Sequence, residues 1–374
     1  MKITFVIPWA NLSGGIRVIT IYAERLQRRG HKVVVLSSSL REKIPIRQQI
    51  KSLLLGRGLY KVLPERSVLH DSGVEHRVLQ PLRHPGDGDF PDADVVVASF
   101  WNTAYHVIGL PPAKGAKAIF LQGYEVEPGK SNPMLDATWR MPLHKILISK
   151  WLVDLAREKF GDTTVSLVPN SVDQEQFYAA PRGKQPVPTV GFMYSKSPLK
   201  GIPTILAALN RVAAVLPSLR VICFGAQQPG LRLRLPSCAE FHHQPPQDKI
   251  KELYRQCDVF LCGSIREGFF LPHLEAMACR CPVVSTRVGG PMDNIEPEIN
   301  GHLVEVGNDG ALADRVLRVL NLPEEKWVAM SEAAYRTATR YTWDDATDLF
   351  EKALELAIER GKRGELQSDG RVMV

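Results

Sequence analysis

The chain alternates short apolar segments with amphipathic segments, and it does so twice, on either side of a polar stretch. The short apolar segments predicted as strands lie at 2–8, 33–36, 94–98, 118–121, 146–148 and 165–168, and again at 189–193, 219–224, 259–262, 282–285 and 302–306. Parallel strands need long crossover connections, which are usually helices. The repeated alternation therefore predicts an α/β chain of two doubly wound, Rossmann-like domains, each with a parallel sheet between layers of helices.

The stretch 171–188 is rich in proline and polar residues and has no periodic apolar face. We interpret it as a linker between an N-terminal domain, 1–170, and a C-terminal domain, 189–342. A last amphipathic helix begins near Trp343, and we expect the segment 343–374 to be this helix, packed back toward the N-terminal domain, plus a tail. Doubly wound sheets bind ligands beyond the carboxyl ends of their strands, so we expect the chemistry in a central cleft that the two domains face.

Composition excludes several classes of protein. With 374 residues, 44% hydrophobic and 23% charged, the chain has the make-up of a globular protein rather than a fibrous or disordered one. Its longest apolar runs, such as 94–100, are much shorter than the roughly 20 residues of a membrane span. Pro8 interrupts the apolar N-terminus, which reads as a strand and not as a signal peptide. We therefore expect a cytoplasmic location.

The cysteines predict no metal site. All six lie in the second half of the chain, mostly within apolar stretches, and none forms a Cys-x-x-Cys pair. We expect buried, reduced thiols that pack as small hydrophobic side chains. Cys279 and Cys281 are close in sequence, but neither a second pair nor a nearby histidine completes a tetrahedral site.

The segment 40–67 supplies most of the net charge of +7, because it holds seven basic residues against two acidic ones. Apolar residues recur in it at helical spacing. A basic amphipathic element suits an anionic membrane surface or a polyanionic acceptor. The alternative is a solvated helix whose apolar side packs on its own domain. Nucleic acid is not an expected partner, since aromatic residues do not interleave the charges.

The most informative segment is SIREGFFLPHLEAMACRCPVVSTRVGG, from Ser264 to Gly290. Neither a Gly-x-Gly-x-x-Gly turn after the first strand nor a phosphate loop of the Walker type is present elsewhere, which argues against a dehydrogenase or a P-loop enzyme. Glu267 lies in a loop after a buried strand, and Glu275 lies in a helix that starts near Pro272. Carboxylates accept bonds from hydroxyl groups, and helix N-termini bind phosphate. A nucleotide sugar needs both kinds of contact.

This segment resembles the signature of the retaining glycosyltransferases of family four, which have the two-domain glycosyltransferase-B fold and a Glu-x7-Glu motif. Their pattern is Glu-Gly-Phe-Gly-Leu-Pro followed by Leu-Glu-Ala-Met-Ala. Further matches occur in the same order along nearly the whole chain: Gly14-Gly15 after the first strand, Ser149 in LISKWLVDLAREKFG, VPNSVDQEQF, SPLKG with Lys200, and RVGGPMDNI before NGHLV. The resemblance places the acceptor in the N-terminal domain and the nucleotide sugar in the C-terminal domain.

The resemblance implies a role for each matching residue. Glu267 would hold hydroxyls of the donor sugar, and Glu275 the ribose of its nucleotide. Lys200 would neutralise the diphosphate, and the Gly14-Gly15 loop would bring backbone amides near the phosphate and the acceptor. The other residues that we expect at the donor are Ser195, Lys196, Gly268, Phe269, Phe270, Leu271 and Arg287.

The chain departs from the family pattern at several positions. Members usually have an arginine soon after the first strand of the second domain, where this chain reads GFMYSKS from 191 to 197. Either Ser195 or Lys196 replaces that cation, or Lys196 is merely exposed. Phe270 and Arg280 stand where the family has glycine. We expect Phe270 to narrow the sugar pocket or to change the backbone near the phosphate.

A further departure concerns the acceptor side. Where many members have a histidine at the end of a central strand, this chain reads FLQGYE. Gln122, Tyr124 and Glu125 are therefore candidates for an acceptor or sugar pocket, together with Trp101, which follows another predicted strand. The alternatives are a loop turned away from the ligand and, for Trp101, packing in the core.

We therefore expect a retaining hexosyl- or deoxyhexosyltransferase of polysaccharide biosynthesis. It would move a sugar from a nucleotide-sugar donor to a hydroxyl of a glycan or a lipid-linked saccharide, without a cofactor or a metal. A glycosyl diphosphate carries its own leaving group, so the protein mainly stabilises charge on that group and excludes water. The alternatives are an inactive nucleotide-sugar-binding protein of the same fold and a sugar-nucleotide epimerase.

Overall fold

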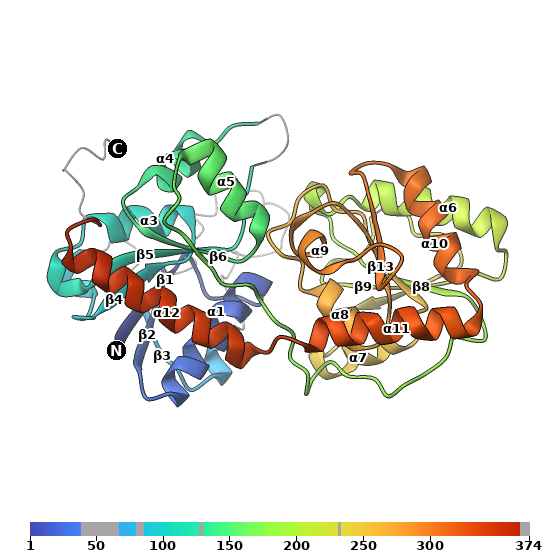
Figure 1. Cartoon of the computed structure of the whole chain (residues 1–374), viewed down its shortest axis with the longest axis horizontal. Coiled ribbons are helices and arrows are strands. Elements are labelled where there is room, and N and C mark those ends of the chain that lie inside the picture. Colours follow the sequence, from blue (N-terminus) through green and yellow to red (C-terminus); the bar gives the residue numbers. More distant parts are fainter. Residues whose placement is uncertain (39–66, 80–85, 127–129, 231–232, 367–374) are drawn as a thin grey trace, which may run out of the picture.

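The computed structural model describes residues 1–38, 67–79, 86–126, 130–230 and 233–366, and it consists of two α/β domains side by side (Figure 1). Each domain is built on one sheet whose strand pairs are all parallel. The strand orders are β3-β2-β1-β4-β5-β6-β7 and β10-β9-β8-β11-β12-β13. In both, the order reverses beside the first strand of the domain, so each sheet has the switch point at which doubly wound folds bind ligands.

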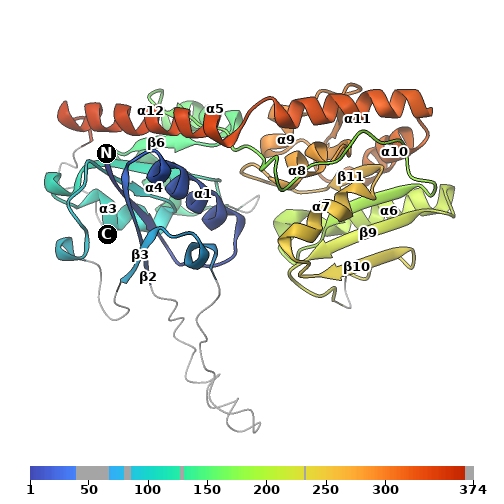
Figure 2. The same ribbon diagram turned by 90° about the horizontal axis from the view of Figure 1, so that it is seen from below.

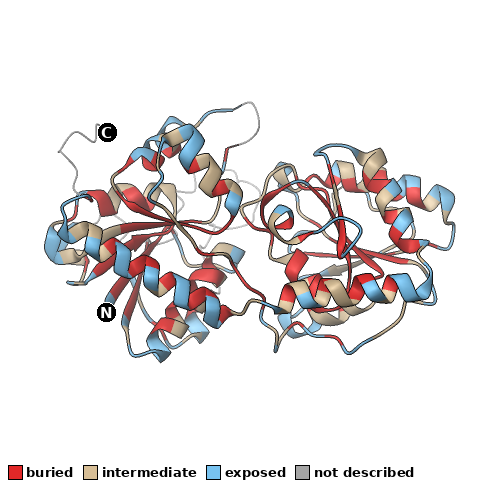
Figure 3. Ribbon diagram, viewed as in Figure 1, coloured by how far each residue is buried: buried red, intermediate tan, exposed pale blue. Residues whose placement is uncertain are grey.

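The N-terminal domain follows the predicted alternation. Its elements are β1 (Lys2–Ile7), α1 (Gly14–Arg28), β2 (Lys32–Ser38), β3 (Glu75–Leu79), β4 (Val95–Ala98), α3 (Trp101–Ile108), β5 (Ala116–Leu121), α4 (Pro133–Arg140), β6 (His144–Leu147), α5 (Lys150–Phe160) and β7 (Ser166–Leu167). The central strands are almost wholly buried, because helices cover both faces of the sheet (Figure 3). The edge strand β3 is the exception, since Leu79 is its one buried residue.

The C-terminal domain repeats the arrangement. Its elements are β8 (Thr189–Met193), α6 (Ile202–Val215), β9 (Arg220–Gly225), β10 (Ala239–His243), α7 (Gln247–Arg255), β11 (Val259–Cys262), α8 (Pro272–Ala278), β12 (Val283–Thr286), α9 (Gly289–Asn294), β13 (Gly301–Val304), α10 (Asp309–Leu320) and α11 (Glu324–Thr339). Pro272 occupies the first turn of α8, where its missing N–H is not needed. The helix therefore starts directly after the loop that carries Glu267.

The last helix, α12 (Trp343–Lys362), leaves the C-terminal domain and lies along the N-terminal one (Figure 2). It packs against β4, β5, β6 and α1. Thr342 caps its first turn by accepting a bond from the Asp345 amide. Buried aromatic rings join it to the domain, with Phe350 stacked 4.3 Å from Tyr22. The C-terminal helix is thus part of the N-terminal hydrophobic core.

Two segments cross between the domains, and they are hydrogen-bonded to each other. The Ser171 hydroxyl donates to the Tyr341 carbonyl at 2.6 Å, and the Tyr341 hydroxyl donates to the Pro169 carbonyl at 3.2 Å. Gln174 adds a bond to the Thr339 carbonyl at 3.0 Å. The two crossing segments therefore form one hydrogen-bonded connection between the domains.

The basic segment 40–67 lies outside the described residues except for Ser67. Its predicted contact with an anionic membrane surface therefore stays a prediction. In the part of the chain that the structure describes, no helix is both long enough and apolar enough to cross a membrane.

Candidate active site

Glu267 and Lys200, two of the predicted donor residues, are brought into direct contact. The Lys200 ammonium lies 2.8 and 2.9 Å from the two carboxylate oxygens of Glu267. The Ser264 hydroxyl donates a third bond to the same carboxylate at 2.6 Å. The carboxylate side chain is only 9% exposed and that of the lysine 27%. The loop after β11 and the turn before α6 thus share one polar centre at the carboxyl end of the sheet.

Glu275 lies one turn into α8, on the side that faces α7 and the N-terminal domain. The Tyr254 hydroxyl donates to it at 2.8 Å. Burial raises the pKa of the Glu275 carboxyl above its usual value, and the positive charge of Arg17 opposes that rise. Glu275 is half-buried by its exposure, and a carboxylate with few partners is a strong acceptor for hydroxyl donors.

Phe270 has an unusual backbone for its residue type. Its φ is +69°, in the left-handed region that favours glycine. The Phe270 ring is centred 5.4 Å from the Lys200 ammonium. Its carbonyl accepts a bond from Nδ1 of His273, whose Nε2 accepts one from Asn294. Burial lowers the pKa of His273 to about 4, so the imidazole is neutral and holds this turn in place.

Gly268 is the point at which the Glu267 loop touches the N-terminal domain. Its carbonyl accepts bonds from the Ser149 hydroxyl at 3.0 Å and from the Trp151 indole at 3.1 Å. A Cβ added at Gly268 would lie 1.7 Å from the Gln122 carbonyl oxygen. A side chain at this position is incompatible with the contact, so glycine is required here for close approach.

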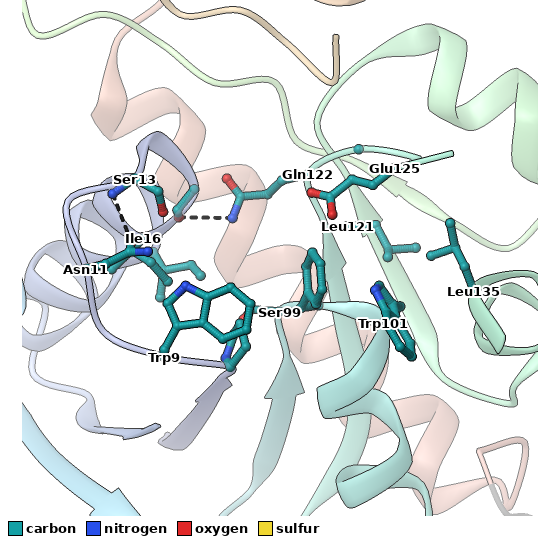
Figure 4. A pocket seen from close by; sticks show the side chains of 15 residues that line it. Trp9, Asn11, Ser13, Ile16, Ser99, Trp101, Leu121, Gln122, Glu125 and Leu135 are labelled. Carbon is teal, nitrogen blue, oxygen red and sulfur yellow. Dashed lines mark hydrogen bonds between the residues drawn. The ribbon is translucent and has the colours of Figure 1, made fainter. Parts of the chain in front are cut away.

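A pocket of about 320 Å³ opens in the N-terminal domain beside this contact (Figure 4). Its walls include Gly15, Trp101, Gln122 and Glu125, four of the predicted residues. The Gln122 amide donates to the Gly15 carbonyl at 3.0 Å, so the loop before α1 and the loop after β5 are tied together at the pocket. Trp9, the other labelled aromatic residue in Figure 4, lines the same pocket.

Glu125 and Tyr124 are neighbours in sequence but have different surroundings. The Glu125 residue is exposed overall, while its carboxyl group lies against the pocket, where desolvation raises its pKa. Tyr124 is buried, does not line the pocket, and points into the core, where its hydroxyl donates to Asp136. The structure therefore assigns Tyr124 to packing instead of the acceptor pocket.

Other predicted donor residues have contacts that are mainly structural. The Ser195 hydroxyl accepts a bond from the Ser197 amide, and Lys196 is exposed. Arg287 pairs with Glu305 at 3.0 Å. Phe269 is buried beside the His273 ring, and Leu271 packs against the same core. Gly14 stands at the first position of α1, with no atom within 4 Å of where a Cβ would be.

Three residues of this region were missed by sequence reasoning. Ser264 and Tyr254 bond to the two glutamates, and no motif marks them. The sequence does offer a sign for Arg17, because a basic residue in the first turn of a helix opposes the helix dipole and is unusual there. Its guanidinium bonds to Gln247 of the other domain and to Gln176 of the linker.

No group of three or more histidine, cysteine, aspartate or glutamate side chains suited to a metal ion occurs among the described residues. The six thiols are all unpaired, and five are buried. Burial raises the pKa of Cys279 to about 12, so this thiol is a packing residue and not a nucleophile.

Solved structures match the chain over almost its full length. Sucrose-phosphate synthase from Thermosynechococcus elongatus matches with a TM-score of 0.71 and 16% identity, over 96% of this chain and all of that one. Anabaena HepE in complex with UDP and glucose matches with a TM-score of 0.71 and 17% identity, over 95% and 99%. The fold is glycosyltransferase-B.

Sequence comparisons point to the same class. Residues 174–337 match the family model "Glycosyl transferases group 1". A D-inositol 3-phosphate glycosyltransferase of Corynebacterium jeikeium is 27% identical over 64% of this chain and 67% of its own length. The protein of that name from Mycobacterium tuberculosis is 35% identical, over 47% of this chain and 39% of its own. These matches support a glycosyltransferase, and the match to the group 1 model covers residues 174–337.

Proposed function

We propose that this protein is a retaining glycosyltransferase that moves a hexosyl or deoxyhexosyl group from a nucleotide-sugar donor to a hydroxyl of a glycan or lipid-linked saccharide. One observation carries the proposal: the loop with Glu267 packs directly on the Gln122 backbone at the edge of the N-terminal pocket. A sugar held by Glu267 would therefore lie next to an acceptor in that pocket.

The C-terminal residues fit a donor with a diphosphate leaving group. Lys200 supplies a positive charge beside Glu267, and Glu275 supplies a half-buried acceptor for ribose hydroxyls. Neighbours of the same fold bind UDP and UDP-glucose, which favours a nucleoside diphosphate sugar as donor. Neither glutamate need act as a nucleophile, since Lys200 already pairs with one and Tyr254 with the other. The leaving diphosphate would then accept the acceptor's proton on the same face, which gives retention.

The N-terminal pocket suits the apolar face of a sugar ring. The Trp9 and Phe100 rings lie 6.2 Å apart, and the Phe100 and Trp101 rings 6.0 Å apart, along one wall. Aromatic faces bind the C–H side of saccharides through hydrophobic contact. Gln122 and Glu125 supply hydrogen-bonding groups for the hydroxyls.

Exposed apolar side chains near this pocket support an acceptor at a membrane surface. Trp9, which lines the pocket, is 37% exposed, and Leu12 and Met134, each next to a lining residue in sequence, are 63% and 51% exposed. Ser67, the last residue of the basic segment 40–67, bonds to the carbonyl of Asn11, another lining residue. Apolar side chains beside a basic segment are typical of peripheral contact with anionic lipids. Replacing Lys51, Arg57 and Lys61 together by glutamine should weaken co-sedimentation with anionic vesicles, and unchanged sedimentation would favour the solvated-helix alternative.

The proposed reaction is tested by release of nucleoside diphosphate from a panel of UDP-, GDP-, ADP- and dTDP-sugars in the presence of saccharide acceptors. Turnover of one donor, lost in Glu267→Ala, is the expected result, and NMR of the product should show the donor's anomeric configuration. An inverted product would overturn retention alone. Binding of a nucleotide sugar without any turnover would instead favour the inactive binding protein.

A further inference from the structure

Arg17 extends from the N-terminal domain and contacts both the linker and the C-terminal domain. It lies in the first turn of α1, next to Gly14 and Gly15. One NH group of its guanidinium donates to the side-chain oxygen of Gln247 at 2.6 Å, and a second donates to that of Gln176. Gln247 is the first residue of α7, the helix that also carries Tyr254. The Arg17 guanidinium therefore contacts the helix whose Tyr254 bonds to Glu275.

The two partners of Arg17 leave its charge uncompensated. Both are amide oxygens, and within the described part of the chain no carboxylate lies within ion-pair distance of the guanidinium. Glu275 is affected by the charge at longer range, since Arg17 lowers the pKa of this carboxyl against the effect of burial. Other arginines of the same helix are paired, as Arg25 is with Asp344. An arginine that served only to join the domains would gain more from a carboxylate.

The position of Arg17 is also unfavourable for a helix. A cation in the first turn faces the positive end of the dipole, and α1 has no acidic residue there and no side-chain cap at Ser13. Positive charge and free amide groups are therefore concentrated on one turn. Such a concentration is stabilised when an anion binds to it.

The diphosphate site proposed in the C-terminal domain requires a further positive charge. Lys200 is neutralised by Glu267, so it cannot by itself balance a diphosphate, which carries more than one negative charge. A guanidinium has five N–H donors in a planar fork, of which the two glutamines take two. The remaining donors suit phosphate oxygens, which guanidinium binds in a bidentate manner.

We propose that Arg17 is a donor-binding residue contributed by the N-terminal domain, and that its guanidinium binds the diphosphate of the nucleotide sugar. The inference rests on the proposed function and adds to it that the donor site is complete only when both domains are in contact. Gln176 and Gln247 hold the guanidinium in place for the ligand.

The test is calorimetric titration of the full chain with UDP, GDP and ADP, followed by the nucleoside of whichever base binds. Arg17→Gln should weaken binding of the diphosphate roughly 10- to 100-fold, the range for a lost bond between charged groups, and change nucleoside affinity less than about threefold. Arg17→Lys should lose less than Arg17→Gln, because it keeps the charge. Arg28→Ala is the matched control, since that arginine lies on the same helix with its side chain 72% exposed.

A second variant separates ligand binding from a purely structural link. Gln176→Ala combined with Gln247→Ala removes both partners but keeps the cation, so diphosphate affinity should fall less than in Arg17→Gln. Equal losses in the two variants, equal losses for nucleoside and diphosphate, or unchanged affinity in Arg17→Gln would each overturn the role of Arg17. If the unmodified protein binds none of the three diphosphates, the proposed donor site fails, and this inference fails with it.

Discussion

The Lys200 ammonium and the Glu267 carboxylate form a two-fold contact, at 2.8 and 2.9 Å, inside the loop layer of the C-terminal sheet. Glu267 is nearly buried, so loss of either partner would leave the other charge unpaired, and each group constrains the other. A donor that binds to both residues must compete with this contact, because its sugar hydroxyls would bond to Glu267 and its diphosphate to Lys200.

Glu267→Gln should therefore separate binding from transfer. We expect transfer to fall by about 100- to 1000-fold, the usual effect of removing one stabilising group in an active site. Affinity for the nucleoside diphosphate should hold or increase, because Lys200 is released from its partner. Steady-state turnover and calorimetry on the same preparation measure the two effects. Near-normal turnover would remove the central role of Glu267.

Phe270 allows a test of backbone conformation, because its φ of +69° favours glycine. Glycine is ordinarily no better than alanine in a folded chain, but at a positive φ it avoids a cost of about 1 kcal/mol. Phe270→Gly should therefore unfold at higher urea concentration than Phe270→Ala. Arg280 has a φ of +60°, so Arg280→Gly should likewise unfold at a higher urea concentration than Arg280→Ala. Alanine variants of equal or greater stability would contradict the assigned backbone.

Gly268→Ala should push the two domains apart, because the new Cβ would lie 1.7 Å from the Gln122 carbonyl oxygen. We expect a larger radius of gyration in small-angle X-ray scattering and a loss of transfer of roughly 100-fold from misplaced reacting groups. Gly310→Ala is the control, since its nearest neighbour is a side-chain atom at 3.7 Å. An unchanged radius together with normal transfer would show that the domains do not need this contact.

Stability should fall between about pH 6.5 and pH 4. His273 and His144 both have a pKa lowered to about 4 by burial, against an ordinary value near 6.5. In this pH range the two histidines are protonated in the unfolded chain but remain neutral in the folded one. The free energy of unfolding therefore decreases as the pH falls through this range. The free energy of unfolding, measured with urea, should differ less between pH 7 and pH 5 in His273→Gln than in the unmodified protein. The same loss in the variant would exclude His273 as a source.

The sequence was sufficient for the fold because apolar segments alternate with helical ones. It also indicated Glu267, Glu275 and Lys200, which lie in ordered motifs. Edge strand β3 was missed, because its residues are mostly exposed and give no apolar run. Helices α3 and α4, of eight residues each, were also missed.

Contacts between the domains could not be predicted, because they join residues far apart in sequence. The carbonyl of Gly268 and the hydroxyl of Ser149 are one example, and the guanidinium of Arg17 with Gln247 is another. The placement of Tyr124 in the core, and not in the pocket, depends on the direction of one side chain at a strand end. Such details follow from packing and leave no pattern in the chain.

The central claim, a nucleotide-sugar site that includes Glu275, is tested most directly by calorimetric titration with nucleoside diphosphates, comparing the unmodified protein with Glu275→Ala. Glu325→Ala, at an exposed position in the first turn of α11, is the control. We predict that the protein binds the diphosphate of one base selectively, that Glu275→Ala weakens this binding at least tenfold by removing the acceptor for the ribose hydroxyls, and that the control does not. Absence of binding by the unmodified protein, or binding that is indifferent to Glu275, would contradict the proposed site.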